Sequence, residues 1–223
     1  MESIRQRAVS MLPSVMLTAL SMVQAIAIEL LWSRLWESPY LWVWGWEAVV
    51  GWSQSVTCFV GFLLMWVLYV TMVVQFRWVP SIRDIIIPFL VGVLEFGLIA
   101  ATAPSLLGIW FGILGLLFLV SFWTSQTTAM RARRDPRNRE FFDGTEPATW
   151  RDLVWPAVPP GALFALSLFF FLTGSKGAFA LMAVLIALGF ILNRMWILSR
   201  WWNHAISETS EPEMVADQAS APS

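Results

Sequence analysis

Two glutamates interrupt long apolar stretches of the sequence and are the residues best suited to chemistry. Glu29 falls in the second half of an apolar run from about 13 to 35, and Glu95 lies near the middle of a run from about 85 to 103. A carboxylate in hydrocarbon is costly, so it normally faces the interior of a helix bundle, where it is paired, protonated or hydrated. Both carboxylates are therefore expected to be shielded from lipid.

Small and polar residues accompany both glutamates at helical spacing. Residues three or four positions apart share one face of a helix. In the first run this face contains Ser14, Thr18, Ser21, Ala25 and Glu29, with Gln24 beside it. In the run of Glu95 the corresponding face contains Asp84, Pro88, Gly92 and Glu95, followed two turns later by Thr102. If these two faces meet, a polar seam crosses much of the membrane.

The polar seam has two interpretations. In the first, Glu29, Glu95, Gln24 and Ser21 form a pathway in which one or both glutamates bind a cation or exchange a proton. In the second, Glu29 reaches water at the outer interface or pairs with Arg34, and Glu95 is a structural residue held by one hydrogen bond. The residue types alone leave both interpretations open.

Other polar and small residues in the apolar runs have structural interpretations. Gly108, Gly112 and Gly115 lie near one face and include a Gly-x-x-x-Gly pattern, which lets two helix backbones approach closely within or between subunits. Arg194, near the end of the last run, is expected to extend toward lipid phosphates. Tryptophans cluster between Trp32 and Trp52, as is typical of side chains that lie at the headgroup level.

Several chemistries lack the residues they need. His204 is the single histidine, so a haem with two axial imidazoles is not expected, and Cys58 is the single cysteine, so neither a disulfide framework nor a cysteine metal site is expected. Zinc-protease, P-loop and dinucleotide-binding motifs are absent from the sequence, and no nucleophile and base can be paired. A net charge of −1 offers no basic field for nucleic acid. We therefore expect no cofactor, no metal and no nucleic-acid partner, and an enzyme ranks third, behind the two functions given below.

The elements that position these residues are expected to be membrane-spanning helices. Hydrophobic residues make up 58% of the 223 positions and charged residues 13%, and the charges cluster between apolar runs long enough to cross a hydrocarbon core of ~30 Å. The sequence predicts an all-α bundle of about six spans, at about 13–35, 53–76, 85–103, 105–124, 153–173 and 178–198. A cytoplasmic loop is expected at 126–152, and a disordered acidic tail at 203–223 follows a single domain over 1–202.

Lys and Arg indicate the orientation of the spans, because positively charged flanks resist translocation. They gather at the N-terminus, near 77–83, in 131–151 and at 194–200, which are alternate segments of a six-span chain, whereas the other side holds Arg34 and Lys176. Both termini are therefore predicted to be cytoplasmic. All but one of the 14 basic residues are Arg, which is typical of high-GC bacterial genomes and favours a bacterial inner membrane. An alternative for the first run is a secretory signal that is cleaved after Ala25-Ile26-Ala27, leaving five spans.

Two functions from different classes follow from these features. The first is a small transporter or channel that moves a proton or a cation past Glu95 and Glu29. The second is a structural or accessory subunit that binds copies of itself or other membrane proteins through its tryptophans and the glycines of its fourth span.

Overall fold

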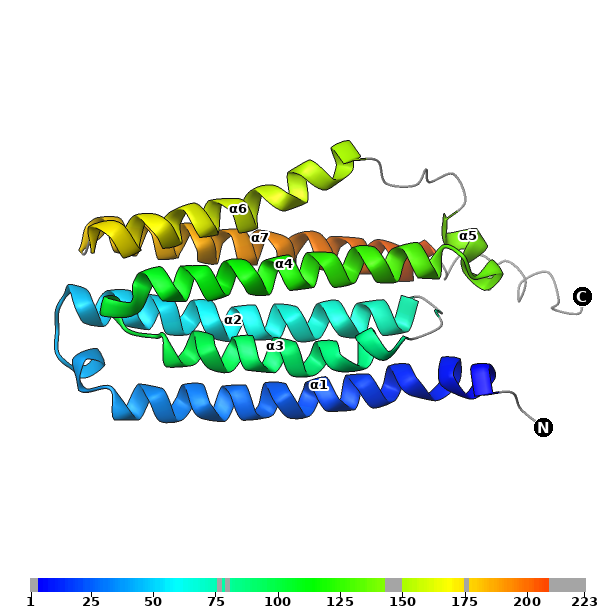
Figure 1. The fold of residues 1–223 in the computed structure, drawn as a ribbon, viewed down its shortest axis with the longest axis horizontal. Helices are drawn as coiled ribbons and strands as arrows, with labels where there is room; N and C mark the ends of the chain where they lie inside the picture. Colours follow the sequence, from blue (N-terminus) through cyan, green and yellow to red (C-terminus); the bar gives the residue numbers. More distant parts are fainter. Residues whose placement is uncertain (1–3, 76–77, 79–80, 143–149, 175–176, 209–223) are drawn as a thin grey trace, which may run out of the picture.

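The structure, a computed structural model, consists of long helices that lie side by side (Figure 1). It describes residues 4–75, 78, 81–142, 150–174 and 177–208. The long helices are α1 (Ile4–Glu37), α2 (Trp46–Gln75), α3 (Ile82–Ala100), α4 (Leu107–Ala132), α6 (Trp150–Thr173) and α7 (Ala178–Glu208). Short helical segments are η1 (Pro39–Trp42), η2 (Pro104–Leu106), η3 (Pro136–Asn138) and α5 (Arg139–Phe142). No strand occurs in the described ranges.

Local sequence explains where several helices begin and end. Ser81 and Asp84 form a capping box at the start of α3, in which the Ser81 backbone N–H donates to the Asp84 carboxylate at 2.7 Å. Pro104 follows α3 and begins η2. Gly174 and Gly177 adopt positive φ angles of 57° and 76° between α6 and α7, a conformation that favours glycine.

The bundle has two flanks around α2 and α4. Helices α1 and α3 pack together on one flank, and α6 and α7 cover the other, with α6 against α4 and α7 against α2 (Figure 1). One apolar core contains residues of all six long helices, and a second lies between α1, α2, α3 and α4. Many large apolar side chains remain exposed on the outside, as expected for a surface that meets lipid.

Five of the described helices are long and apolar enough to cross a membrane: α1, α2, α4, α6 and α7. The remaining predicted span, at about 85–103, corresponds to α3, which has 19 residues and includes Arg83, Asp84 and Glu95. It lies inside the same bundle, against α1 and α4. The fold is thus all-helical with five membrane-length apolar helices, and α3 is the shortest of the six long helices and carries three charged residues.

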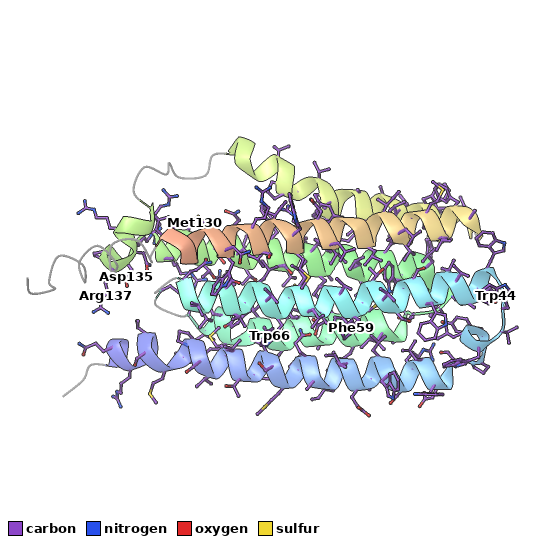
Figure 2. All side chains as sticks on the ribbon, turned by 180° about the vertical axis from the view of Figure 1, so that it is seen from behind. Trp44, Phe59, Trp66, Met130, Asp135 and Arg137 are labelled. Carbon is purple, nitrogen blue, oxygen red and sulfur yellow. The ribbon has the colours of Figure 1, made fainter. Side chains whose placement is uncertain are left out.

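The two ends of the bundle differ in chemistry. Trp44 lies at the end opposite to Asp135 and Arg137 (Figure 2). At the first end, Trp32, Trp36, Trp42 and Trp52 form a chain of ring contacts with centroids 5.2–5.8 Å apart. The first described residues of α1 and the last of α7 lie at the other end (Figure 1).

Two helices extend past the predicted boundaries of the loop and the tail, and some residues used in the predictions lie outside the described residues. Helix α4 continues to Ala132, past the predicted start of the loop at 126, and α7 continues to Glu208, past the predicted start of the tail at 203. Hydropathy marks where a helix leaves the lipid, whereas the helix itself can continue into water. Arg77, Lys176, residues 143–149 and residues 209–223 are outside the described part of the chain.

Candidate functional site

The central feature of the interior is a pair of polar side chains from α1 and α3. Glu95 is fully buried, and the Gln24 amide donates a hydrogen bond of 2.7 Å to its Oε1 atom. The other carboxylate oxygen, Glu95 Oε2, and the amide oxygen of Gln24 have no hydrogen-bond partner among the described residues. A buried carboxyl group with one free oxygen can accept a further donor or, when protonated, donate.

The close approach of α1 and α3 brings this pair together. A Cβ atom on Gly92 would lie 2.6 Å from Cγ1 of Val23, closer than such atoms approach in proteins. Val23 adjoins Gln24 in the chain, and Gly92 lies about one turn before Glu95. The absence of a side chain at Gly92 therefore lets the amide reach the carboxyl group.

Further polar side chains lie between Glu95 and the tryptophan end. Cys58 Sγ lies 4.0 Å from Thr102 Oγ1, and both groups are buried. The Tyr40 hydroxyl, in η1, donates to the backbone oxygen of Thr102 at 3.0 Å, and burial raises the pKa of Tyr40 so that it remains a donor. Gln54, one turn before Cys58 on α2, is fully buried, and neither of its amide atoms has a partner among the described residues.

Toward the opposite end, two small cavities follow each other between α1, α2, α3 and α4. The first, of about 30 Å³, is lined by Leu20 and Val91, each one turn from Gln24 and Glu95 respectively. The second, of about 10 Å³, reaches Asp84, and both cavities are lined by Tyr69 and Thr124. A cavity needs roughly 10–15 Å³ to hold a water molecule, so the first has room for one and the second is at the limit.

An ion pair closes this row of cavities. The buried Asp84 carboxylate accepts hydrogen bonds from both terminal nitrogens of Arg131, including one of 2.8 Å to its Oδ1 atom. Arg131 is 28% exposed and also donates to Ser81 Oγ at 3.0 Å. The pair joins the start of α3 to the end of α4; its carboxylate lines the second cavity, and its guanidinium group is partly exposed to water.

The predicted polar face of α1 points away from α3. Ser14, Thr18, Ala25 and Glu29 are exposed on the outside of the bundle, and the buried face contains Met16, Leu20, Gln24, Ala27 and Leu31. The expectation that Glu29 is shielded is therefore wrong for the single chain. Ser21 is half-buried and accepts a hydrogen bond of 3.1 Å from the Trp66 indole. Of the four predicted pathway residues, the structure joins only Gln24 and Glu95.

The three glycines of α4 all face α6. A Cβ on Gly108 would lie 2.9 Å from the backbone nitrogen of Phe171, and one on Gly112 would lie 2.9 Å from Ser167 Oγ. Gly115 meets Leu163 at 3.3 Å. The Ser167 hydroxyl donates to the Gly108 backbone oxygen at 2.7 Å. These contacts hold the two backbones close along this part of α4.

Sequence reasoning missed several members of the interior polar set. It treated Cys58 only as a lone thiol, and it did not single out Gln54 or Tyr69, although all three lie within the predicted second span. A search for uncharged polar residues within the predicted spans would have found them. Among the described residues no three His, Cys, Asp or Glu side chains gather closely enough to hold a metal ion.

Comparison with known proteins assigns no family: no family model, curated protein or solved structure matches the chain significantly. Conclusions about function therefore depend on the geometry of the interior.

Proposed function

We propose that this chain is a multi-pass membrane protein that moves protons, with Glu95 as the group that takes up and releases them. The observation that carries the proposal is a carboxyl group buried in the bundle with one hydrogen bond from Gln24 and one free oxygen. An ionised carboxylate with so few partners is costly in a membrane interior. Exchange of a proton at this group relieves that cost without moving a helix.

The small cavities support a proton rather than a larger cation as the species that moves. The spaces of about 30 and 10 Å³ between Glu95 and Asp84 admit one water molecule, not an ion with its hydration shell. Protons pass along hydrogen bonds between side chains and single waters, and Tyr69 and Thr124 supply hydroxyl groups there. Beyond Glu95, the hydroxyl groups of Thr102 and Tyr40 continue toward the other end.

A proton-flux assay tests the proposal. Glu95→Gln keeps the acceptor of the Gln24 hydrogen bond but removes the exchangeable proton, and Glu29→Gln is a matched control on the outer surface. In proteoliposomes with an internal pH-sensitive dye and an imposed pH gradient, the wild type and Glu29→Gln should conduct protons, and Glu95→Gln should fall to the level of protein-free vesicles. Equal flux from Glu95→Gln and the wild type, or wild-type flux no greater than that of empty vesicles, overturns the proposal.

For the topology we propose six spans, with α3 as the third, and both termini in the cytoplasm of a bacterial inner membrane. Support comes from the basic residues near both ends of the chain and in the segment from Arg131 to Arg139, and from the tryptophans at the opposite end of the bundle. Cysteines introduced singly at Ser10 and Trp44 test this arrangement with a membrane-impermeant thiol reagent. In intact cells Trp44→Cys should react and Ser10→Cys should not, and the reverse result contradicts the orientation.

A second candidate function is an accessory subunit of a membrane complex, with a second copy of the chain or another membrane protein on α1. The observation that favours it is the exposed face with Ser14, Thr18, Ala25 and Glu29, since small and polar residues at this spacing are typical of contacts between membrane helices. Thr18→Cys in native membranes should then form crosslinked species of higher mass. Its failure to crosslink, together with Glu95-dependent flux, would leave proton transfer as the function.

A further inference from the structure

A cavity of about 500 Å³ lies apart from Glu95, between α2, α4, α6 and α7. It follows α2 from Gly61 to Gln75, a distance of about 21 Å at 1.5 Å per residue. Half of a hydrocarbon core of ~30 Å is about 15 Å, so the cavity is long enough for one leaflet of lipid. Its volume falls within the range of small-molecule sites, roughly 300–1,000 Å³.

The cavity arises from the way α6 packs. Near the tryptophan end, Gly108, Gly112 and Gly115 hold α6 tightly against α4. Toward its beginning α6 diverges from α4 and α7 (Figure 1), and Pro156 and Pro159 line the cavity there. One side of the cavity is thus bounded by a helix segment that is separated from the rest of the bundle.

The wall of the cavity changes from apolar to polar along its length. The deep end is lined by apolar residues, among them Leu64, Leu114 and Ile191, and a Cβ on Gly61 would meet Ile191 at 3.8 Å. Polar side chains follow toward the end of the bundle opposite the tryptophans: Thr71, Gln75, Ser121, Ser125, Gln126 and Arg194. Such a gradient suits an amphiphile with its tail in the deep end.

Arg194 is the charged residue of this wall. Its guanidinium group lies over the ring of Phe190, 5.4 Å from the centroid, and no acidic side chain among the described residues forms an ion pair with it. Phe190 contacts Phe118 on α4, with ring centroids 5.5 Å apart, and α4 and α7 run in the same direction (Figure 1). Arg194 lies one turn after Phe190, so it is level with the α4 residues one turn beyond Phe118. Ser125 and Gln126 follow within the next turn of α4.

We propose that this cavity binds an anionic phospholipid of the bilayer, with one acyl chain in the apolar end and the phosphate group at Arg194. The unpaired guanidinium supplies the charge that a phosphate requires, and it binds phosphate oxygens in a bidentate geometry. Ser125 and Gln126 supply further hydrogen-bond donors on the facing helix. The separated beginning of α6 gives the lipid a lateral entrance from the membrane.

Native mass spectrometry of the purified full-length protein tests this site. The protein is incubated with equal amounts of phosphatidylglycerol and phosphatidylcholine that carry identical acyl chains. We expect retained phosphatidylglycerol to exceed retained phosphatidylcholine, and Arg194→Gln to weaken phosphatidylglycerol binding about tenfold, the effect of one charge-assisted hydrogen bond. Arg200→Gln is the matched control, because Arg200 lies on the same helix over the Trp196 ring but does not line the cavity.

A second variant tests the contribution of the acyl chain separately from that of the headgroup. Gly61→Leu places a side chain into the deep end, where the nearest contact of a Cβ is an ordinary 3.8 Å, so the helix can accept it. This variant should elute as the wild type does in size-exclusion chromatography but retain less of both lipids. The proposal fails if the wild type retains both lipids equally, if Arg194→Gln and Arg200→Gln behave alike, or if Gly61→Leu retains as much lipid as the wild type.

Discussion

Gly92→Ala should destabilise the protein more than Gly97→Ala, the equivalent change at the other glycine of α3. The new Cβ would lie 2.6 Å from Val23 Cγ1, about 0.8 Å short of the 3.4 Å at which ordinary contact begins. Val23 is β-branched, so its rotation is restricted, and α1 must move away instead. A shift of that size would lengthen the 2.7 Å hydrogen bond between Gln24 and Glu95 to about 3.5 Å, beyond useful strength.

The expected loss combines two effects. Overpacking costs about 1–3 kcal/mol, and a buried polar pair that loses its hydrogen bond costs about 1–3 kcal/mol more, with the two partly sharing the same movement. Thermal unfolding in detergent, followed by size-exclusion chromatography, should show a melting temperature several degrees lower for Gly92→Ala. Adding Val23→Ala to Gly92→Ala should restore most of the lost melting temperature, because the clashing methyl groups of Val23 are removed.

Gly97→Ala is the matched control on the same helix. Its Cβ would meet Ile113 Cδ1 at 3.4 Å, within ordinary contact, and alanine favours the helix by nearly 1 kcal/mol over glycine. Its melting temperature should equal or exceed that of the wild type. The reasoning is refuted if Gly92→Ala is as stable as Gly97→Ala, or if Val23→Ala only adds a further loss to Gly92→Ala.

Two further variants test the other contacts of the bundle. Asp84→Asn removes the charge that faces Arg131 and should lower the free energy of unfolding by about 3 kcal/mol, as when one partner of a buried pair is lost. The control Arg134→Gln, at an exposed residue, should change that free energy little. Equal melting temperatures for the two variants would contradict this prediction. Gly108→Ala places a methyl group against the backbone of α6 and should lower the free energy of unfolding by about 1–3 kcal/mol. Gly161→Ala is the control, because the space around its Cβ is open, and it should not lower that free energy. If the two variants are equally stable, α6 can move away from α4 at little cost, and the prediction is wrong.

The buried face of α3 could be predicted from sequence, but the buried face of α1 could not. On α3 the charged Asp84 and Glu95 share a face with Gly92, and the cost of charge in lipid fixes which way that face turns. On α1 the spacing correctly placed Ser14, Thr18 and Glu29 on one face, but it did not indicate whether that face points into the bundle or outward. In a membrane an apolar face suits lipid and a protein core equally well, so the pattern alone cannot choose between them.

The large cavity also lay beyond sequence reasoning. Gly108, Gly112 and Gly115 indicated a close helix contact, but not that α6 would be the partner or that the contact would cover only part of α6. Arg194 was expected to extend toward lipid phosphates, which is compatible with the proposed site but does not predict a cavity beside it. Such a space depends on how two helix axes diverge, which a pattern along one helix does not record.

The central claim is that the Glu95 carboxyl group gains and loses a proton inside the folded bundle. Infrared difference spectroscopy of the protein in lipid, between two pH values at which it stays folded, measures this directly through the C=O stretch of a protonated carboxyl group. A pH-dependent band should be present in the wild type and in Glu29→Gln and absent from Glu95→Gln. The same band in Glu95→Gln, or no pH-dependent band in the wild type, would contradict the claim.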